Sequence, residues 1–277
     1  MAKKKKEASL AGHLIKSRKL VWNLAKNDIK KKFAGSYFGV IWAFVQPVIT
    51  VLLYWFVFEK GLNSKATDLR TGIEIPFVLW LMAGLVPWFY FQEAMNGGTG
   101  VLVEYSYLVK KVVFQIDILP VVKMISALFT HLFFVVFAIA IFACMGYFPD
   151  LYVLQVVYYS FCMILFTTGL VYATSAVTVF FRDMKEVVGI VLQIGMWVTP
   201  IMWNFESMVQ IPGWAVTILK LNPMYYIVSG YRDALINKIG FWENPGLTAY
   251  FWIVTVLLLL LGTTIFKRLR PHFADVL

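Results

Sequence analysis

The sequence predicts an all-α integral membrane protein with six transmembrane helices. Long uncharged runs lie between its charged residues, from Lys32 to Glu59, from Pro149 to Phe181 apart from Asp150, from Glu186 to Glu206 and from Glu243 to Lys267. A membrane-spanning helix needs about 20 apolar residues to cross about 30 Å of hydrocarbon. These runs are evenly apolar, whereas the strands of an outer-membrane barrel alternate over about 10 residues. We therefore expect helices in a bilayer.

Composition supports a membrane protein and excludes several other classes. Of the 277 residues, 60% are hydrophobic and 14% are charged, well below the ~25% charged residues of soluble proteins. A net charge of +10 would suggest nucleic acid in a soluble protein. Here, basic residues that flank spans and meet anionic lipid headgroups explain it better, so no nucleic-acid partner is predicted. Cys144 and Cys162 lie in hydrophobic runs and form neither a disulfide framework nor a metal pattern.

Residues 1–36 are expected to form a basic cytoplasmic arm that contains an amphipathic helix lying in the membrane surface. Apolar residues recur at helical spacing, namely Ala11, Leu14, Ile15, Trp22, Ala25, Ile29 and Phe33. Basic residues fall on the other side, namely Lys16, Lys19, Lys26, Lys30 and Lys31. The pattern fits a structural anchor, and it also fits a helix that guards a cytoplasmic entrance.

We expect the spans near residues 37–58, 76–95, 119–146, 154–180, 187–205 and 247–267, within one transmembrane domain of residues 37–277. Cytoplasmic loops of membrane proteins carry an excess of Lys and Arg. With the N-terminus inside, eighteen of these residues fall in cytoplasmic segments and six fall outside. The sequence thus predicts a multi-pass protein of the cell membrane with both termini in the cytoplasm.

Residues 206–243 hold two short apolar stretches, Ser207–Leu219 and Met224–Ile236, which Asn222-Pro223 separates. Thirteen helical residues are about 20 Å long, too short to cross the hydrocarbon. We expect two re-entrant helices that dip in from the outer face and return. Backbone broken at membrane depth is tolerated where protein or a water-filled cavity covers it, so a pathway is indicated. The alternative is a surface loop with two interfacial helices.

Two cytoplasmic loops are candidate contact sites for a soluble partner. After Asn96–Gly100, residues 104–114 read as a short helix that carries Lys110 and Lys111. Such a helix fits either docking on a partner or lying at the interface. The loop with Arg182 and Asp183 is a second, smaller candidate.

Several kinds of chemistry are absent from the sequence. It contains no Gly-x-x-x-x-Gly-Lys-[Ser/Thr] phosphate loop and no His or Cys metal motif, so neither an ATP site nor a metal site is predicted. His131 lies inside a predicted span, where a neutral, hydrogen-bonded role is favoured over a functional one. Lys123 and Glu93 lie near span ends, where they can reach water. No acidic residue lies at a span centre, as an ion-driven carrier would require.

Aromatic residues make up 17% of the chain, and most are expected in belts at the membrane interfaces. Aromatic faces also stack on sugar rings and allow a polymer to slide. A minority of these residues is therefore predicted to line a path. The candidates are Trp42, Trp88, Tyr90, Phe91, Trp197 and Trp203.

Four motifs, in order, resemble one membrane-protein family. They are Tyr37–Pro47 (YFGVIWAFVQP), Pro76–Trp88 (PFVLWLMAGLVPW), Phe181–Met184 (FRDM) and Leu221–Tyr226 (LNPMYY), the last followed by Arg232. With the basic arm, they resemble the membrane subunit of ABC-2 type polysaccharide exporters over nearly the whole chain. The wall teichoic acid exporter permease is the most similar, and the O-antigen exporter permease is a near relative.

The resemblance implies an N-terminal gate helix, a coupling helix between the second and third spans, and two re-entrant helices before the last span. It also implies a dimer around a central channel, with two separate ATPase subunits that bind ATP and Mg²⁺. The chain itself would then hold no cofactor and would not be an enzyme. By position, residues 11–33 correspond to the gate helix, and Asn222, Pro223 and Arg232 to the re-entrant motif. The ATPase contacts would be Glu104, Tyr105, Tyr107, Lys110, Lys111, Arg182 and Asp183.

The resemblance predicts export of a polymer linked to undecaprenyl diphosphate, with teichoic acid as the first candidate. The polymer would enter beside the gate helix, where basic residues attract its phosphates. The entrance residues would be Arg18, Lys19, Trp22, Lys26, Lys30 and Lys31. Three alternatives stay open: an O-antigen or capsular polysaccharide exporter, an ABC-2 exporter of drugs or lipids, and a membrane enzyme of lipid-linked sugar assembly.

Overall fold

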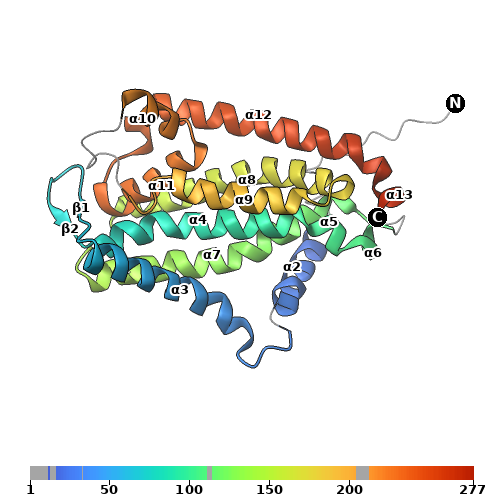
Figure 1. Ribbon diagram of the computed structural model, residues 1–277, viewed down its shortest axis with the longest axis horizontal. Helices are drawn as coiled ribbons and strands as arrows, with labels where there is room; N and C mark the ends of the chain where they lie inside the picture. The colour runs from blue at the N-terminus through green and yellow to red at the C-terminus, as the bar shows by residue number, and fades with distance from the viewer. Residues whose placement is uncertain (1–11, 13–16, 33, 111–113, 204–211) are drawn as a thin grey trace.

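The structure is a bundle of long helices with a short β-hairpin at one end and short helices at the other (Figure 1). It is a computed structural model that describes residues 12, 17–32, 34–110, 114–203 and 212–277. The longer helices are α2 (Arg18–Lys32), α3 (Trp42–Trp55), α4 (Phe77–Thr99), α7 (Leu119–Cys144), α8 (Gln155–Phe180), α9 (Met184–Val198) and α12 (Pro245–Leu269). The shorter elements are β1 (Ala66–Thr67), β2 (Glu74–Ile75), α5 (Val101–Glu104), α6 (Ser106–Val109), α10 (Gly213–Lys220), α11 (Pro223–Arg232) and α13 (Phe273–Val276).

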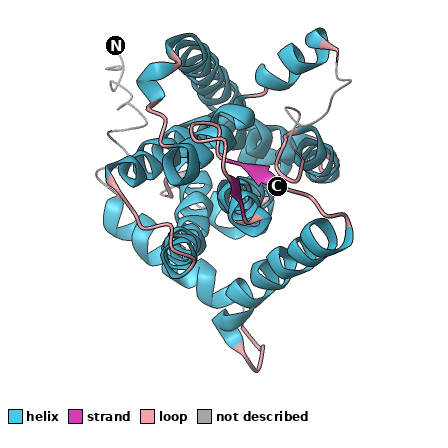
Figure 2. Cartoon of the chain, turned by 90° about the vertical axis from the view of Figure 1, so that its left-hand side faces the viewer, coloured by secondary structure: helices cyan, strands magenta, loops and turns pink. Residues whose placement is uncertain are grey.

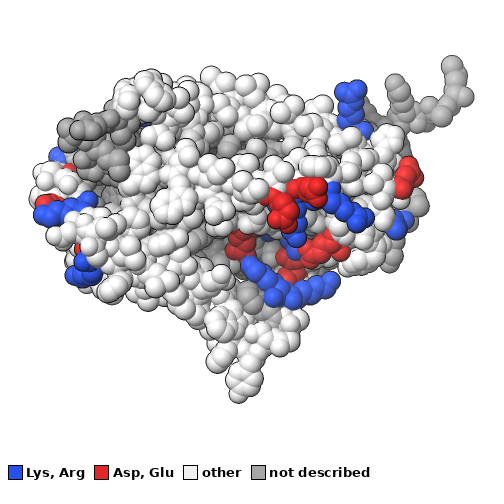
Figure 3. Space-filling model, viewed as in Figure 1, with Lys and Arg blue, Asp and Glu red and all other residues white. Residues whose placement is uncertain are grey.

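Five helices in the described part of the chain are long and apolar enough to cross a membrane. They cover Trp42–Gly61, Phe77–Thr99, Ile116–Cys144, Leu151–Phe180 and Pro245–Val276. In the view of Figure 3, charged side chains lie at the left end and over the right half of the molecule, and an uncharged band lies between them. An uncharged band of helices is suited to the lipid interior, because each helix hydrogen-bonds its own backbone N–H and C=O groups.

The fifth predicted span, residues 187–205, is not confirmed as a full crossing. Helix α9 has 15 residues and ends at Val198, so it is about 22 Å long. Thr199 is extended, as expected for a residue that precedes a proline, and Pro200 follows it. The turn after α9 therefore stops the helix before it reaches the length of the hydrocarbon core.

Helix α4 is the centre of the bundle. It packs against α3, α7, α8, α9 and α11, and most of its side chains are buried. Seen from the hairpin end, several helices lie close to end-on, with the hairpin in front of the middle of the bundle (Figure 2). Because lipid tails are as apolar as these side chains, close packing rather than the hydrophobic effect holds such helices together.

Two predicted boundaries differ from the structure. The first span does not begin at residue 37, because Gly39 has a φ of +56° and the α-helix starts at Trp42; it continues through a π turn, Phe56–Gly61. The predicted 104–114 helix begins earlier and is broken, since α5 ends at Glu104 and α6 begins at Ser106. Tyr105, between them, is buried and leaves helical geometry with φ −101° and ψ 29°.

The region predicted as re-entrant contains two short helices in the expected order, α10 and α11, with Asn222 between them. The first predicted stretch begins at Ser207, which lies outside the described residues, and its described helix starts at Gly213. Their depth in the membrane stays a prediction.

Helices α8 and α12 cross so closely that Gly169 has no room for a side chain. A Cβ atom on Gly169 would lie 2.7 Å from the carbonyl carbon of Leu258 in α12. Small residues allow this kind of close backbone contact between membrane helices. The crossing fixes the last long helix against the bundle.

Gly169→Ala is expected to lower the stability of the purified protein by about 1–3 kcal/mol, the usual cost of overpacking. Gly189→Ala in α9 is the matched control, because no atom lies within 4 Å of the added Cβ. Thermal unfolding in detergent measures both variants. Equal melting temperatures for the two variants would contradict the close crossing.

Candidate functional site at the junction of α2, α5 and α7

Helix α2 is not a free surface helix, because one of its faces packs on the start of α7. Val21 and Ala25 are buried against Ile118 and Val122. Asp28 lies on the same face, seven residues after Val21, and is also buried. A spacing of three, four and seven residues places side chains on one side of a helix. This face therefore carries one carboxylate into the protein.

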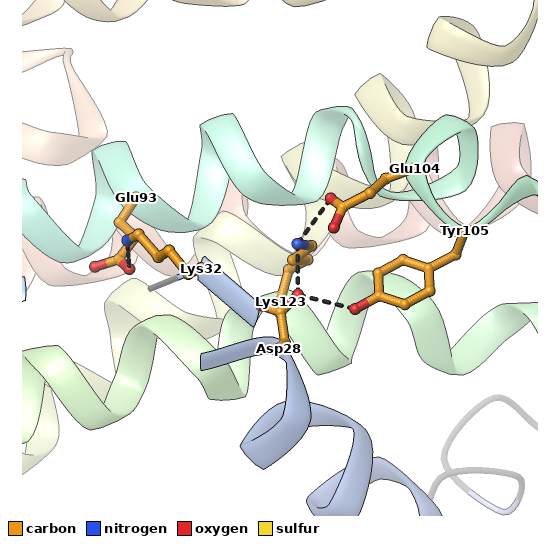
Figure 4. A network of polar contacts seen from close by, with 6 residues as sticks. All are labelled: Asp28, Lys32, Glu93, Glu104, Tyr105 and Lys123. Atoms are coloured by element: carbon orange, nitrogen blue, oxygen red, sulfur yellow. Dashed lines mark hydrogen bonds and ion pairs between the residues drawn. The ribbon is translucent and has the colours of Figure 1, made fainter. Parts of the chain in front are cut away.

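The Asp28 carboxylate joins three elements (Figure 4). Its Oδ1 atom accepts hydrogen bonds from Lys123 Nζ in α7, at 2.6 Å, and from the Tyr105 hydroxyl, at 2.9 Å. Lys123 Nζ also lies 2.8 Å from Glu104 Oε2, at the end of α5. We call Asp28, Glu104, Tyr105 and Lys123 the junction cluster. It links α2, α7 and the α5–α6 segment through one ammonium and two carboxylates.

The two ion pairs of the junction cluster differ in burial. The side chains of Asp28 and Lys123 are 8% and 12% exposed, whereas that of Glu104 is 51% exposed. Removing one partner of a buried pair leaves an uncompensated charge and costs about 3–5 kcal/mol. An exposed pair contributes about 0–1 kcal/mol. The Asp28–Lys123 contact is therefore the strong link, and the Glu104 contact is the adjustable one.

Tyr105 remains a donor to Asp28 across the physiological pH range. Burial and then the nearby Asp28 carboxylate raise the pKa of Tyr105 above its ordinary value near 10. The hydroxyl is therefore protonated at neutral pH and donates its hydrogen to the carboxylate. This neutral donor supports the charge on Asp28 without competing with Lys123.

Further contacts fasten α2 along its length. Just before its first residue, the hydroxyl of Ser17 donates to Gln115 Oε1. At its last residue, Lys32 Nζ lies 2.6 Å from Glu93 Oε1 of α4, as Figure 4 also shows. Helix α2 is thus held to the loop before α7, to α7 itself and to α4.

A second polar constellation lies where α9 ends. Arg232, at the end of α11, donates from Nη1 to the Pro200 carbonyl at 2.7 Å and from Nη2 to the Ile201 carbonyl at 2.8 Å. Its guanidinium stacks over Trp80 at 3.3 Å from the ring centre. Asn222 caps α11 by accepting from Met224 N, and its Nδ2 donates to Thr199 Oγ1. The two side chains thus pair with polar groups of the turn that follows α9, from Thr199 to Ile201.

Comparison with known protein families identifies the family of this chain. A model of the ABC-2 type transporter family matches residues 19–236, which is most of the chain. The chain belongs to the ABC-2 type transporter family. With its long apolar helices, it is therefore a multi-pass membrane protein, and the family consists of transport subunits that work with separate ATPase subunits.

Three curated relatives of this ABC-2 transporter are O-antigen export system permease proteins called RfbA. The Myxococcus xanthus protein is 25% identical over 266 residues, covering 96% of this chain and 98% of its own. Two Klebsiella pneumoniae proteins are 23% and 22% identical over 256 residues, each covering 92% of this chain and 93% of its own. The similarity supports the predicted polysaccharide-exporter relationship. The specific prediction of teichoic acid has no support from these relatives.

Some of the residues predicted to contact the ATPase are exposed, at α6 and at the α8–α9 turn, whereas Tyr105 is buried. Tyr107 and Lys110 are exposed on and after α6, and Arg182 and Asp183 are exposed in the turn between α8 and α9. Tyr105 instead faces inward, while Lys111 lies outside the described residues. Contact with an ATPase subunit stays a prediction for all of them.

The predicted entrance residues lie on the outer side of α2. Arg18, Lys19, Lys26 and Lys30 are exposed. Trp22 is 44% exposed and packs on Phe129 of α7, with Lys26 Nζ over its ring at 5.2 Å. Lys31 differs, because its Nζ lies over the rings of Tyr105 and Tyr107 at 5.3 and 6.0 Å. Lys31 therefore belongs to the junction as well as to the basic face.

The six aromatic channel candidates separate into two groups. Trp88, Tyr90 and Phe91 are at most 7% exposed and pack inside the bundle around α4, so they reach no surface in this structure. Trp42 and Trp197 are 46% and 57% exposed on α3 and α9, and Trp203 Nε1 donates to the Trp197 carbonyl. Trp42 and Trp197 of this second group are exposed in the present conformation, and the lining of a channel stays a prediction for all six residues.

The importance of Asp28 and Lys123 was missed from the sequence. Lys123 was expected to reach water, which is wrong, because its side chain is 12% exposed and held between two carboxylates. One signal was available: Asp28 is the single acidic residue of α2, and it falls on the apolar face, in register with Val21 and Ala25. Among the described residues, no group of three or more His, Cys, Asp or Glu side chains can hold a metal ion.

Arg232→Lys is expected to destabilise the protein. A lysine ammonium cannot donate to both carbonyls with the planar geometry of a guanidinium, and it has no flat face to stack on Trp80. Each lost charged hydrogen bond costs about 1.5–3 kcal/mol. Thermal unfolding in detergent measures the loss. Arg268→Lys, at an exposed position of α12, is the control. If both variants melt at the wild-type temperature, Arg232 does not hold the end of α9.

Proposed function

We propose that this chain is the transmembrane subunit of an ATP-driven exporter that moves a lipid-linked cell-envelope polysaccharide outward across the cell membrane. The observation that carries the proposal is the match to the ABC-2 family over residues 19–236, with relatives named as O-antigen export permeases along almost their whole length. The geometry supports it, because a basic helix is joined to an exposed segment that is suited to contact a partner subunit.

In the proposed orientation, the end that carries α2, α5, α6 and α13 faces the cytoplasm, and the hairpin end faces outward. Basic residues support this assignment, because Lys and Arg favour the cytoplasmic side. The basic end of α12, Lys267–Arg270, and the exposed lysines of α2 both lie on that side. Helices α10 and α11 would then be the outer, re-entrant pair of the permease.

Two copies of the chain would form the channel, and two ATPase subunits would bind from the cytoplasm with ATP and Mg²⁺. Exposed apolar side chains on α3 and α9 fit a face that meets lipid or a second copy, among them Leu52, Leu53, Ile190, Ile194 and Trp197. The exposed residues of α6 and of the α8–α9 turn would meet the ATPase. The family's separate ATPase subunits would supply the energy, through mechanical contact with these residues.

The polymer would enter beside α2, attached to undecaprenyl diphosphate. Clustered positive charge raises the local concentration of anions, and Lys19, Lys26 and Lys30 present such charge to the membrane surface. The relatives' names favour a polysaccharide of the O-antigen type as the exported polymer. A teichoic acid, with a phosphate in every repeat, is the second candidate and fits the same basic face.

The test is reconstitution of the permease with its ATPase in lipid vesicles, followed by measurement of ATP-dependent movement of lipid-linked polymers. We expect movement and ATPase stimulation by lipid-linked O-polysaccharide or teichoic acid. Stimulation by drugs or free lipids alone would favour the drug or lipid exporter. Synthesis of a lipid-linked sugar by the purified chain alone would favour the enzyme.

Reversing the charges of the two lysines that follow α6 in the sequence, Lys110→Glu with Lys111→Glu, is expected to lower transport-coupled ATPase activity by about 5-fold or more, a typical coupling factor between two sites. The reason is that the reversed charges would repel the surface on which the wild-type segment docks. The control reverses Lys65 and Arg70 in the loop of the hairpin end. Normal coupling in the Lys110/Lys111 variant would count against docking at α6.

Replacing Lys19, Lys26 and Lys30 by Gln is expected to weaken stimulation by an anionic teichoic-type lipid and to flatten its salt dependence, because exposed charges act through screened attraction. Stimulation by a neutral lipid-linked polymer should change less, since only its diphosphate is charged. ATPase assays at two ionic strengths measure both effects. Unchanged affinity for both polymers would remove the basic face of α2 from the entrance.

A further inference from the structure

We propose that Asp28 is the positioning residue through which the ATPase-contacting segment α5–α6 moves helix α2, so that the entrance beside α2 opens in step with ATP binding. The proposal rests on the proposed exporter function and adds to it a specific mechanical connection. It concerns the junction cluster and the chain on either side of α2.

The connection is direct because neighbouring residues reach Asp28 from one side. Glu104 ends α5, and Tyr105 follows it immediately. The Tyr105 hydroxyl contacts Asp28 itself, and Glu104 contacts Lys123, which in turn contacts Asp28. A displacement of this short segment therefore acts on the α2 carboxylate by two routes.

The connection is stiff because the Asp28 contacts are shielded from water. Asp28 and Lys123 are almost fully buried, and the aliphatic neighbours Val21, Ala25 and Val122 surround the same face. Buried charges are screened much less than exposed ones, so salt and solvent do not loosen the pair. The Glu104 contact is half exposed, whereas Tyr105 is buried, so the hydrogen bond from Tyr105 to Asp28 is the stiffer of the two routes.

The other end of α2 is built to bend. Between α2 and α3 the chain turns at Gly35 and Gly39, whose φ angles are +83° and +56°, and among the described residues no atom beyond the chain neighbours would lie within 4 Å of a Cβ added to either glycine. Tyr37, between them, is 96% exposed. Glycine adopts such φ values without steric cost. In Figure 1, helices α2 and α3 diverge from this turn.

Helices α2 and α3 contact different parts of the protein. Helix α2 is fastened to α4, α5 and α7 through Lys32, the junction cluster and its apolar face. Helix α3 follows α2 across the glycine-containing turn and packs on α4, whereas α2 packs mainly on α7. A movement of α5–α6 therefore reaches α2 directly through Asp28, whereas the junction cluster includes no residue of α3. The separation between α2 and α3 would increase, beside the basic residues proposed to attract the lipid diphosphate.

The test uses the full complex with its ATPase in lipid nanodiscs, in a Cys144→Ser background with one permease copy labelled. Spin labels at Asn27→Cys on α2 and Ile49→Cys on α3 report their separation by pulsed electron paramagnetic resonance. We expect the wild-type separation to change when Mg-ATP and vanadate are added. In Asp28→Asn the change should be lost, polymer movement should fall by about 5-fold or more, and ATP hydrolysis should continue.

Tyr105→Phe removes only the hydroxyl and keeps the ring, so it remains informative if Asp28→Asn does not assemble. We expect a smaller separation change than in wild type. Asp275→Asn, an exposed carboxylate of α13, is the matched control and should behave as wild type. A full wild-type change in Asp28→Asn or in Tyr105→Phe would overturn the proposal, as would a change lost equally in the control.

The same experiment separates this proposal from the exporter function. If the wild-type complex moves polymer but α2 and α3 keep a constant separation, the positioning role is wrong and the exporter function stands. If the wild-type complex moves no lipid-linked polymer, the exporter function is wrong, whatever the labels report.

Discussion

The buried contact between Asp28 and Lys123 is the interaction on which the proposed entrance depends. It places a charged side chain of a lysine-rich surface helix inside the protein, where only a paired charge is tolerated. Once this pair is fixed, Tyr105 and Glu104 have defined partners, and α2 has one position relative to α5 and α7. The exposed lysines of α2 are then presented on the opposite side of the helix.

The other constraint is the hydrocarbon itself, which requires that broken helices find internal partners for their polar groups. Arg232 and Asn222 supply those partners where α9 stops short. The two constellations lie at opposite ends of the bundle, one near α5 and α13 and the other near the hairpin (Figure 1). Both constellations use a buried charge to hold irregular chain, as the Asp117–Arg270 pair before α7 also does.

The long elements were predictable because apolar composition and length determine them directly. The helices α4, α7, α8 and α12 lie within a few residues of their predicted spans, and the break at Asn222-Pro223 is present. The junction cluster was not predictable, since its members lie 77 and 95 residues apart in sequence and only folding brings them together. The length of α9 was also missed, although Pro200 signals its end locally. The contact that holds the following turn, from the distant Arg232, could not be read from the sequence.

A double-mutant cycle between Asp28 and Lys123 tests the central interaction most directly. Thermal unfolding in detergent would compare Asp28→Leu, Lys123→Met and the double variant with wild type. Lys123→Met should lose about 3–5 kcal/mol, because it leaves the buried Asp28 carboxylate without a cation, and Asp28→Leu should lose less, because Glu104 still pairs with Lys123. The double variant removes both buried charges, so its loss should be smaller than the sum of the two single losses. Additive losses in the double variant would show that the two side chains act independently, and the account of how α2 is held would fail.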